Sequence, residues 1–389
     1  MRLWRATLYM KIAIIIEDVN RVAGQERVVA ELLHRLATRH EIHLFCYEAS
    51  DIPGGVIMHR LRQPRVHSFM VRALWIVLAS WFAVRVRRYD AVLSQGGNAL
   101  NQTHTLVHNC LARRWELTRQ VYWKLRPPSL VERLLRTFWY TTVVRLERRA
   151  VRRCRQGRTL AVSHELADLL SHYHGVPREE ITVCENGVDH QVFFPDPADP
   201  ARSRLRAEMG VAEDDVLAIF LGGLWLEKGA TYSVEALSRT DARLHLCLAG
   251  RDDPEPFRTL AAKLGVAQRL HFLPGTDRPW EYFRAADLLL FPGHAEGFGL
   301  VAVEAAACGL PVLMTRVGVG ERLVQDGVSG YLISQECDEI AERLNALVCN
   351  PEERRRMGAT AYAASLQFSW DRQATEVEQA LAAPVVRSS

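Results

Sequence analysis

Two series of short apolar runs, each alternating with amphipathic segments of helix length, constrain the fold of this chain more than any other feature. The first series is "KIAIII" (11–16), "IHLFCY" (42–47), "AVLSQ" (91–95), "HTLVHN" (104–109), "TLAVS" (159–163) and "ITVCE" (181–185). The second is "VLAIFLG" (216–222), "LHLCLAG" (244–250), "LHFLPG" (270–275), "LLLFPG" (288–293), "PVLMT" (311–315) and "GYLI" (330–333). Segments between them, such as "QERVVAELLHRLATR", place apolar residues three and four apart. The alternation predicts an α/β fold with two buried parallel sheets.

The length and one proline-rich stretch predict two domains. A chain of 389 residues exceeds the size at which one core usually stops growing. The stretch "FFPDPADPARSRL" (193–205) reads as a linker and places the boundary near residue 198. We therefore expect domains at 1–198 and 199–368, with a helix and tail in 369–389 that return to the first domain. Two open α/β domains would leave a cleft outside the carboxyl ends of their strands, where ligands bind in such sheets.

The cysteines and the apolar segments indicate a cytoplasmic protein. None of the eight cysteines forms a Cys-x-x-Cys pair or another metal-ligand spacing, and none comes with an evident base. The longest apolar run, "ALWIVLASWFAV" (73–84), is shorter than the roughly 20 residues of a spanning helix. The start "MRLWRATLYMKIAIII" favours a first strand over a signal peptide, with residues 1–9 as a dispensable extension and either Met1 or Met10 as the first residue.

The charge is unevenly distributed along the chain. Residues 1–160 contain 28 Lys and Arg against 11 Asp and Glu, a net charge of +17, whereas the remainder has a net charge of −13. In 60–90 and 111–158 the arginines are interleaved with Trp, Tyr and Leu. This combination suits an anionic membrane surface, so we expect peripheral binding at the inner face of the plasma membrane. A solvated charged face over core aromatics is the plainer alternative. No nucleic-acid-binding motif is present.

Two carboxylates stand eight positions apart in "HAEGFGLVAVEAAACGLP" (294–311). Glu296 precedes a predicted helix that ends at Gly309, and Glu304 lies about one and a half turns into it. The start of a helix binds anions, and Gly297 and Gly299 lack side chains that would obstruct one. The two carboxylates could thus accept hydrogen bonds from hydroxyls on either side of a phosphate, as in a nucleotide diphosphate sugar. Alternatively, Glu296 only caps the helix and Glu304 is half exposed.

The segment "PGHAEGFGLVAVEAAACGLPVLMTRVGVGERLVQDGVSGYLI" resembles the signature of retaining glycosyltransferases of family 4, which have the GT-B fold of two facing Rossmann-like domains. "GGLWLEKGATYSVEAL" resembles their phosphate-binding loop, and "VAGQERVVAELLHRLATRHEIHLF" their first glycine loop and helix. "LAVSHELADLLSHYHGVPREEITVCENGVDHQVFFP" resembles the segment that enters the linker. The resemblance covers about residues 11–375 and is weaker over 50–155.

The resemblance implies roles for individual residues. Glu304 would accept hydrogen bonds from the ribose and Glu296 from the transferred sugar, and both belong to the donor site. Lys228 would neutralise the diphosphate, which lowers the barrier to departure of an anionic leaving group. The implied donor-binding residues also include Gly24, Gly222, Gly223, Arg251, Gly297, Phe298, Gly299 and Leu300, with the backbone amides of 298–300 on the diphosphate.

The sequence departs from the family at two glycine-loop positions. An Arg usually stands about five positions before the Lys, where this chain has Gly223, and Arg251 is the candidate substitute. Ala23 replaces one of two glycines beside Gly24. His108 matches the histidine that faces the donor sugar across the cleft, with His104 as its rival.

The resemblance implies a front-face retaining mechanism without a cofactor. No obvious nucleophile, metal-ligand cluster or Asp-x-Asp triplet is present, which favours a metal-independent enzyme with a UDP- or GDP-linked sugar as co-substrate. Residues 250–292 also resemble lipopolysaccharide-core glucosyltransferases, which suggests a cell-envelope glycan or glycolipid acceptor. The alternatives are a nucleotide-sugar epimerase of the same fold and a non-catalytic membrane- or nucleic-acid-binding descendant, which Gly223 would support.

Overall fold

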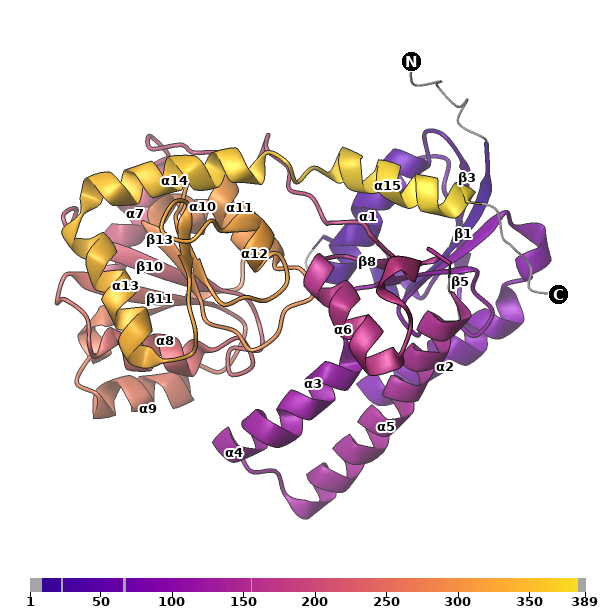
Figure 1. Cartoon of the computed structure of the whole chain (residues 1–389), viewed down its shortest axis with the longest axis horizontal. Helices are drawn as coiled ribbons and strands as arrows, with labels where there is room; N and C mark the ends of the chain where they lie inside the picture. Colours follow the sequence, from indigo (N-terminus) through magenta and orange to yellow (C-terminus); the bar gives the residue numbers. More distant parts are fainter. Residues whose placement is uncertain (1–8, 22–23, 66–67, 155, 384–389) are drawn as a thin grey trace. The chain divides into compact units, whose positions relative to one another are not determined.

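The computed structural model describes residues 9–21, 24–65, 68–154 and 156–383, and the elements named below lie in these ranges. The described residues form two compact units (Figure 1). The first unit runs to Asn186 and includes the residues from Trp370 onward. The second unit is Gly187–Ser369.

The first unit is built on a seven-stranded sheet in the order β5-β3-β1-β6-β7-β8-β9. Its strands are β1 (Lys11–Ile15), β3 (Glu41–Cys46), β5 (Ile57–Arg60), β6 (Ala91–Gln95), β7 (His104–Val107), β8 (Thr159–Ala161) and β9 (Ile181–Val183), and β2 (Asp18–Val19) pairs with β4 (Glu48–Ala49) beside it. All neighbouring strands are parallel, for example with Ile12 of β1 aligned with Ile42 of β3 and Ala91 of β6. Since parallel strands need crossovers, helices separate most of them.

The helices of the first unit are α1 (Gly24–Leu36), α2 (Phe69–Ala83), α3 (Leu111–Leu117), α4 (Trp123–Leu125), α5 (Leu130–Arg153), α6 (His164–His174) and α15 (Trp370–Ala382), with short turns η1 (Val86–Arg88), η2 (Thr118–Tyr122) and η3 (Arg178–Glu180). A π-helical turn, η2, joins α3 to α4. We call residues 111–153 the arm, because α3, α4 and α5 extend together from the unit (Figure 1). The C-terminal helix α15 packs against α1, and its Glu378 contacts His40 and Arg39, just after α1, at 2.9 and 2.8 Å.

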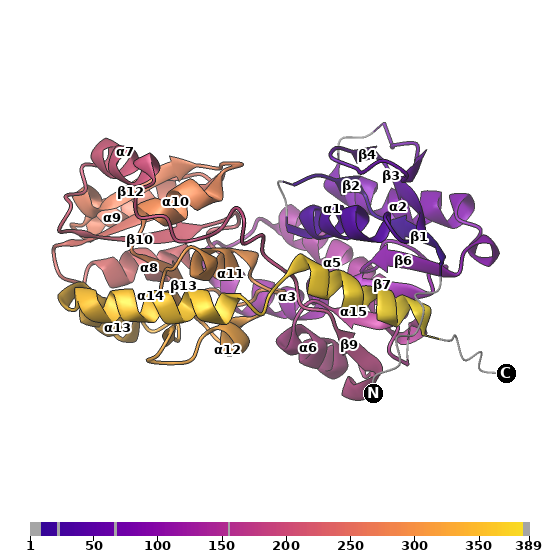
Figure 2. The same cartoon turned by 90° about the horizontal axis from the view of Figure 1, so that it is seen from above.

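The second unit is built on a six-stranded parallel sheet in the order β12-β11-β10-β13-β14-β15. Its elements are α7 (Pro200–Met209), β10 (Val216–Leu221), α8 (Ala230–Leu237), β11 (Leu244–Gly250), α9 (Glu255–Lys263), η4 (Ala267–Arg269), β12 (Leu270–Pro274), α10 (Pro279–Ala285), β13 (Leu288–Phe291), α11 (Leu300–Ala307), β14 (Val312–Met314), α12 (Gly320–Leu323), β15 (Gly330–Leu332), α13 (Cys337–Cys349) and α14 (Pro351–Ser365). Helices α8, α9 and α13 cover one face, and α7, α10, α11 and α14 the other (Figure 1, Figure 2). The interiors of the central strands β10 and β13 are fully buried, as their apolar runs require.

The predicted α/β fold with two parallel sheets is confirmed, and each of the twelve apolar runs contains a strand. The division between the units differs from the prediction, because it lies between Asn186 and Gly187 and not near residue 198. The proline-bearing stretch packs on the second unit instead of forming a free linker. Phe193 is buried against Phe283, and Arg284 donates to the carbonyl oxygens of Val192 and Phe194.

Candidate functional site

The second sheet reverses its strand order beside β10, and this point positions the candidate site. The chain runs from β10 outward to β11 and β12, and then returns to place β13 on the other side of β10. Open α/β sheets bind ligands outside the carboxyl ends of the strands at such a point. Two loops leave the sheet there, 222–229 after β10 and 292–299 after β13. They contain seven of the predicted site residues.

The loop 222–229 has a tightly defined backbone. The buried indole of Trp225 donates to the carbonyl oxygen of Gly222 at 2.8 Å. The Asp252 carboxylate, just beyond β11, accepts from the backbone amides of Leu224 and Trp225 at 3.1 and 2.7 Å. Gly229 has a φ of +86°, and a Cβ there would lie 2.2 Å from the carbonyl oxygen of Pro292. Only glycine lets the two loops approach this closely.

The two loops are joined by an ion pair between predicted site residues. Lys228 Nζ lies 2.6 Å from Glu296 Oε2, and both side chains are partly exposed. The Lys228 ammonium also lies 5.3 Å from the centre of the Phe291 ring at the end of β13. A cation and a carboxylate from different loops therefore meet at the strand-order reversal.

The loop 292–299 leads into the start of α11. Gly299, with a φ of +95°, is the N-cap residue, and Leu300 is the first helical residue. The first amides of a helix lack intrahelical acceptors and carry partial positive charge. Phe298 is buried and packs against Phe368, so its backbone and not its ring is available to a ligand. Its carbonyl oxygen accepts from the Val319 amide at 2.7 Å, which holds the loop in place.

Glu304 is buried on α11, with 5% of its surface exposed. This contradicts the alternative in which it is half exposed on the helix. Carboxylates are rarely so buried without a specific role or partner. It lies one turn beyond the helix start, on the same short element that begins after Glu296 and Gly297.

Arg251 and Gly223 lie at the edge of the same loop. Arg251 is exposed and has no ion pair with any described residue. Gly275 leaves space for it, since a Cβ at 275 would lie 2.7 Å from Arg251 Cγ. A Cβ at Gly223 would meet Asp252 Oδ1 at an ordinary 3.7 Å, so the missing arginine is not explained by lack of room.

The predicted residues of the first unit lie on separate elements. Gly24 begins α1 and is exposed, whereas Val22 and Ala23 lie outside the described residues. His108 follows β7, and its Nε2 lies 2.7 Å from Gln95 Oε1 at the end of the neighbouring β6. Desolvation lowers the pKa of His108 to about 3, so the ring is neutral at physiological pH.

His104, the rival of His108, is a core residue. It is fully buried, and its Nδ1 lies 2.9 Å from the Thr103 hydroxyl. Burial lowers the pKa of His104 to about 4. Because His108 retains some exposed surface, it is the histidine of the two that a ligand can reach.

Sequence reasoning missed the residues that brace the loops. Asp252 stands beside Arg251 in "GRDD", and its position directly after β11 was the available signal. His294, inside the quoted motif, lies 2.9 Å from the Tyr232 hydroxyl of α8 and thereby links loop 292–299 to that helix. Their partners are far apart in sequence, so residue spacing could not reveal them.

A half-buried acidic group just after β1 was also missed. Glu17 lies beside Arg72, whose guanidinium pairs with Asp18 at 2.6 Å. Burial raises the pKa of Glu17 to about 7. The Tyr47 hydroxyl donates to the Arg72 carbonyl oxygen at 3.0 Å. This group occupies the carboxyl edge of the first sheet, where β1 lies between β3 and β6.

Cys110, Glu147 and His174 form a buried trio in the first unit, with ligand-type atoms within 4.8 Å of one another. Their hydrogen bonds are structural. Glu147 accepts from the Leu111 amide at the start of α3 and lies 2.7 Å from His174 Nε2. Burial raises the pKa of the Cys110 thiol to about 12, which disfavours the thiolate that binds metals. We assign the trio to fixing α3 against α5 and α6.

Two family models match most of the chain between them. "Glycosyltransferase Family 4" matches residues 22–192, and "Glycosyl transferases group 1" matches residues 201–364. The curated D-inositol 3-phosphate glycosyltransferase of Xylanimonas cellulosilytica is 36% identical over 223 residues, covering 54% of this chain and 53% of that protein. The one from Geodermatophilus obscurus is 37% identical over 224 residues, covering 54% and 48%. The chain thus spans about half the length of the curated relatives it matches.

Solved structures match over nearly the whole chain. WaaG, a glycosyltransferase involved in lipopolysaccharide biosynthesis, has a TM-score of 0.78 at 20% identity and covers 96% of this chain and 100% of its own. Anabaena Alr3699/HepE in complex with UDP and glucose has a TM-score of 0.72 at 20% identity, covering 97% and 100%. At this level of identity the likeness establishes the fold, which is GT-B.

Proposed function

We propose that this chain, which belongs to the group 1 glycosyltransferases of GT-B fold, is a retaining, metal-independent enzyme that moves a sugar from a nucleotide diphosphate sugar to a cell-envelope glycan or glycolipid. One observation carries the proposal. Lys228, Glu296, the start of α11 and the buried Glu304 lie together where the strand order of the second sheet reverses. A cation and helix amides suit a diphosphate, and the two carboxylates suit hydroxyls on either side of it.

In the proposed reaction the diphosphate lies against the amides of residues 298–300 and draws Lys228 from Glu296. Glu296 then accepts from a hydroxyl of the transferred sugar, and Glu304 from the ribose. The bond between the anomeric carbon and the phosphate oxygen breaks as the acceptor oxygen bonds to the same face of that carbon. The departing phosphate takes the acceptor's proton. Lys228 stabilises the charge that develops on the leaving group.

The remaining predicted residues are assigned supporting roles. Gly222 and Gly297 keep the two loops clear of side chains, and Arg251 supplies the cation that Gly223 does not. In the first unit, we propose that Gly24 and His108 contact the substrate. The neutral His108 ring, with its proton on Nε2 toward Gln95, leaves Nδ1 as an acceptor for a hydroxyl.

For the acceptor we propose a lipid-linked or lipopolysaccharide-core-like glycan at the inner face of the plasma membrane. The net charge of +17 over residues 1–160 supports a negatively charged surface beside this half. An inositol phosphate acceptor is the second candidate, because the curated relatives that match at 36–37% identity are named for that activity.

A thermal-shift screen of UDP-, GDP- and ADP-sugars tests the donor. We expect one nucleotide series to raise the melting temperature, with no requirement for a divalent cation. Turnover of that donor is then measured with and without acceptor in the presence of EDTA, and the anomeric configuration of the product is read by NMR. Retention with acceptor-dependent turnover supports the proposal. Acceptor-independent isomerisation or hydrolysis would identify an epimerase instead, and loss of activity in EDTA would contradict metal independence.

A further inference from the structure

The first half of α5 exposes a continuous apolar face. Leu130, Val131, Leu134, Leu135 and Phe138, which we call the apolar stripe, each expose between 55% and 73% of their surface. Their spacing places them on one side of the helix, since positions one, four, five and eight apart share a face. Single exposed apolar residues are common, but a contiguous exposed stripe marks an interaction surface.

The same side of α5 becomes basic in its second half. Arg145 and Arg149 lie seven and eleven positions after Phe138, which keeps them on the face of the stripe. Both are exposed, and neither forms an ion pair with any described residue. Arg148 and Arg152 on this side instead donate to the carbonyl oxygens of Tyr173 and His174. One helix face therefore presents apolar side chains followed by two available guanidinium groups.

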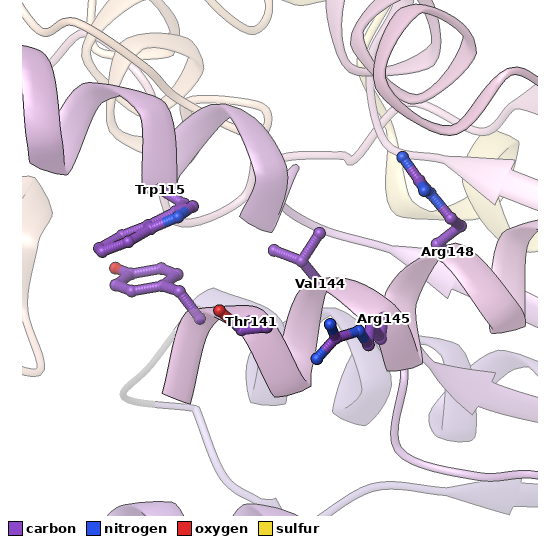
Figure 3. Close-up of a pocket in the computed structure, with 6 residues that line it drawn as sticks. Trp115, Thr141, Val144, Arg145 and Arg148 are labelled. Atoms are coloured by element: carbon purple, nitrogen blue, oxygen red, sulfur yellow. The ribbon is translucent and has the colours of Figure 1, made fainter. Parts of the chain in front are cut away.

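A cavity of about 230 Å³ lies at the junction of the two helices. It is lined by Trp115 of α3 and by Tyr140, Thr141, Val144, Arg145 and Arg148 of α5 (Figure 3). The Trp115 and Tyr140 rings stack at 4.8 Å between their centres. An aromatic wall with two guanidinium groups at its border suits a ligand with an anionic head and an apolar body.

Charge identifies the occupant of this surface. The arm contains 12 Lys and Arg against 3 Asp and Glu, a net charge of +9, so two copies would repel each other if they paired through it. A phosphate backbone would not contact the apolar stripe, which disfavours nucleic acid as the partner of this surface. An anionic bilayer offers an apolar boundary to the stripe and lipid phosphates to the arginines, so it suits both halves of this helix face. Among the described residues, none of the helices has the length and hydropathy that a membrane span requires.

We propose that α5 is the membrane-contacting helix of this protein. Its apolar stripe enters the boundary between head groups and acyl chains, Arg145 and Arg149 contact lipid phosphates, and the cavity beside Trp115 accepts one phospholipid head group. This assignment rests on the proposed function in one respect: the membrane would carry the acceptor that the enzyme uses. Lipid binding and donor binding are separate measurements, so the failure of one does not decide the other.

Vesicle sedimentation of the full chain tests this assignment. We expect binding to phosphatidylcholine vesicles that contain phosphatidylglycerol and little binding to phosphatidylcholine alone. Removing two exposed side chains of the apolar stripe by Leu134→Ser with Phe138→Ser should weaken binding by about tenfold or more, because they would no longer be buried in the bilayer. Arg145→Glu with Arg149→Glu should weaken it similarly and also reduce its dependence on salt. Matched changes on exposed residues of the second unit, Leu366→Ser and Arg355→Glu, should leave it unchanged.

Donor-induced thermal shift is recorded for every variant and should equal that of the wild type, which shows that folding and the second unit are intact. A wild-type protein that does not bind vesicles containing phosphatidylglycerol would overturn the proposal. So would unchanged binding of the α5 variants combined with lost binding of Trp81→Ser with Phe82→Ser, because α2 has exposed aromatic residues of its own.

A fluorescent label at residue 134 locates the contact directly. Six of the eight cysteines are buried, so Cys337→Ser and Cys349→Ser provide a background for labelling Leu134→Cys. An environment-sensitive dye there should shift its emission to shorter wavelength on anionic vesicles, whereas a dye at Lys263→Cys on α9 should not. Sedimentation without any emission shift at residue 134 would show that α5 stays outside the bilayer.

Discussion

Lys228 Nζ lies 2.6 Å from Glu296 Oε2, and this ion pair connects the loops that follow β10 and β13. Each charge is balanced by the other, and both side chains retain contact with solvent. An ion pair that keeps contact with solvent contributes little to stability, so a diphosphate can displace the carboxylate at small cost. The pair thus holds both groups at the position where the proposed donor needs them.

Replacing the cation should impair transfer more than folding. Lys228→Met removes the charge that faces the leaving group, and loss of one such group typically lowers kcat by about 100-fold or more. The melting temperature should change little, since the pair is partly exposed. Lys263→Met, on an exposed position of α9, is the matched control for kcat. A kcat within twofold of the wild type in Lys228→Met would contradict the assigned role.

Two glycines of the same loop should differ strongly in their tolerance of alanine. A Cβ at Gly229 would lie 2.2 Å from the Pro292 carbonyl oxygen, so Gly229→Ala must separate the loops, and we expect a loss of more than about 2 kcal/mol in the free energy of unfolding. Gly223→Ala meets its nearest atom at 3.7 Å and should change stability by about 0.5 kcal/mol or less. Urea unfolding measures both. Equal effects would refute the proposed close contact of the loops.

Restoring the arginine that relatives of the family have should strengthen donor binding. Position 223 is exposed and has room for a side chain, so Gly223→Arg can place a guanidinium beside the diphosphate. A charge-assisted hydrogen bond should lower the Kd of the donor by about tenfold. Gly223→Gln is the uncharged control of similar length. If both variants bind the donor equally, the site does not hold a diphosphate near residue 223.

The pKa of Glu17 predicts a pH-dependent stability difference. The folded chain holds this proton up to about pH 7, whereas an unfolded chain releases it near 4.5. Folding is therefore penalised increasingly as the pH rises from 4.5 to 7, and fully above that. Glu17→Gln removes the penalty and should stabilise the protein by on the order of 1 kcal/mol at pH 8, but hardly at pH 4.5.

Melting curves of Glu17→Gln and wild type across this range test the prediction. Glu48→Gln, at an exposed neighbouring strand position, should show no such pH-dependent difference. A Glu17→Gln variant that is destabilised most at high pH would mean that the carboxylate is stabilised by Arg72 and not penalised by burial.

The strands were predictable because buried parallel strands are continuous apolar runs. β5 was missed, since Ile57–Arg60 is a half-exposed edge strand with a mixed sequence. The division of the units was misplaced because prolines mark irregular backbone and do not report what it packs against. Phe193 and Arg284 fix that stretch through contacts that are distant in sequence.

The site was predictable where one motif contains several of its residues, as in 294–311. The Lys228–Glu296 contact, the Asp252 brace and the burial of Glu304 depend on packing between separate elements, which residue spacing does not encode. The apolar stripe of α5 has the same periodicity as a helix facing a core. Only the structure distinguishes an exposed stripe from a buried one.

Isothermal titration of the preferred nucleotide sugar into wild type and Glu304→Gln tests the central claim most directly. Glu304 belongs to the proposed donor site, and the substitution preserves its shape while removing its charge. We expect wild type to bind one donor and Glu304→Gln, shown to be folded by its melting curve without ligand, to bind it about tenfold more weakly or worse. Equal affinities in a folded variant, or no binding of any nucleotide sugar by the wild type, would contradict a donor site at the start of α11.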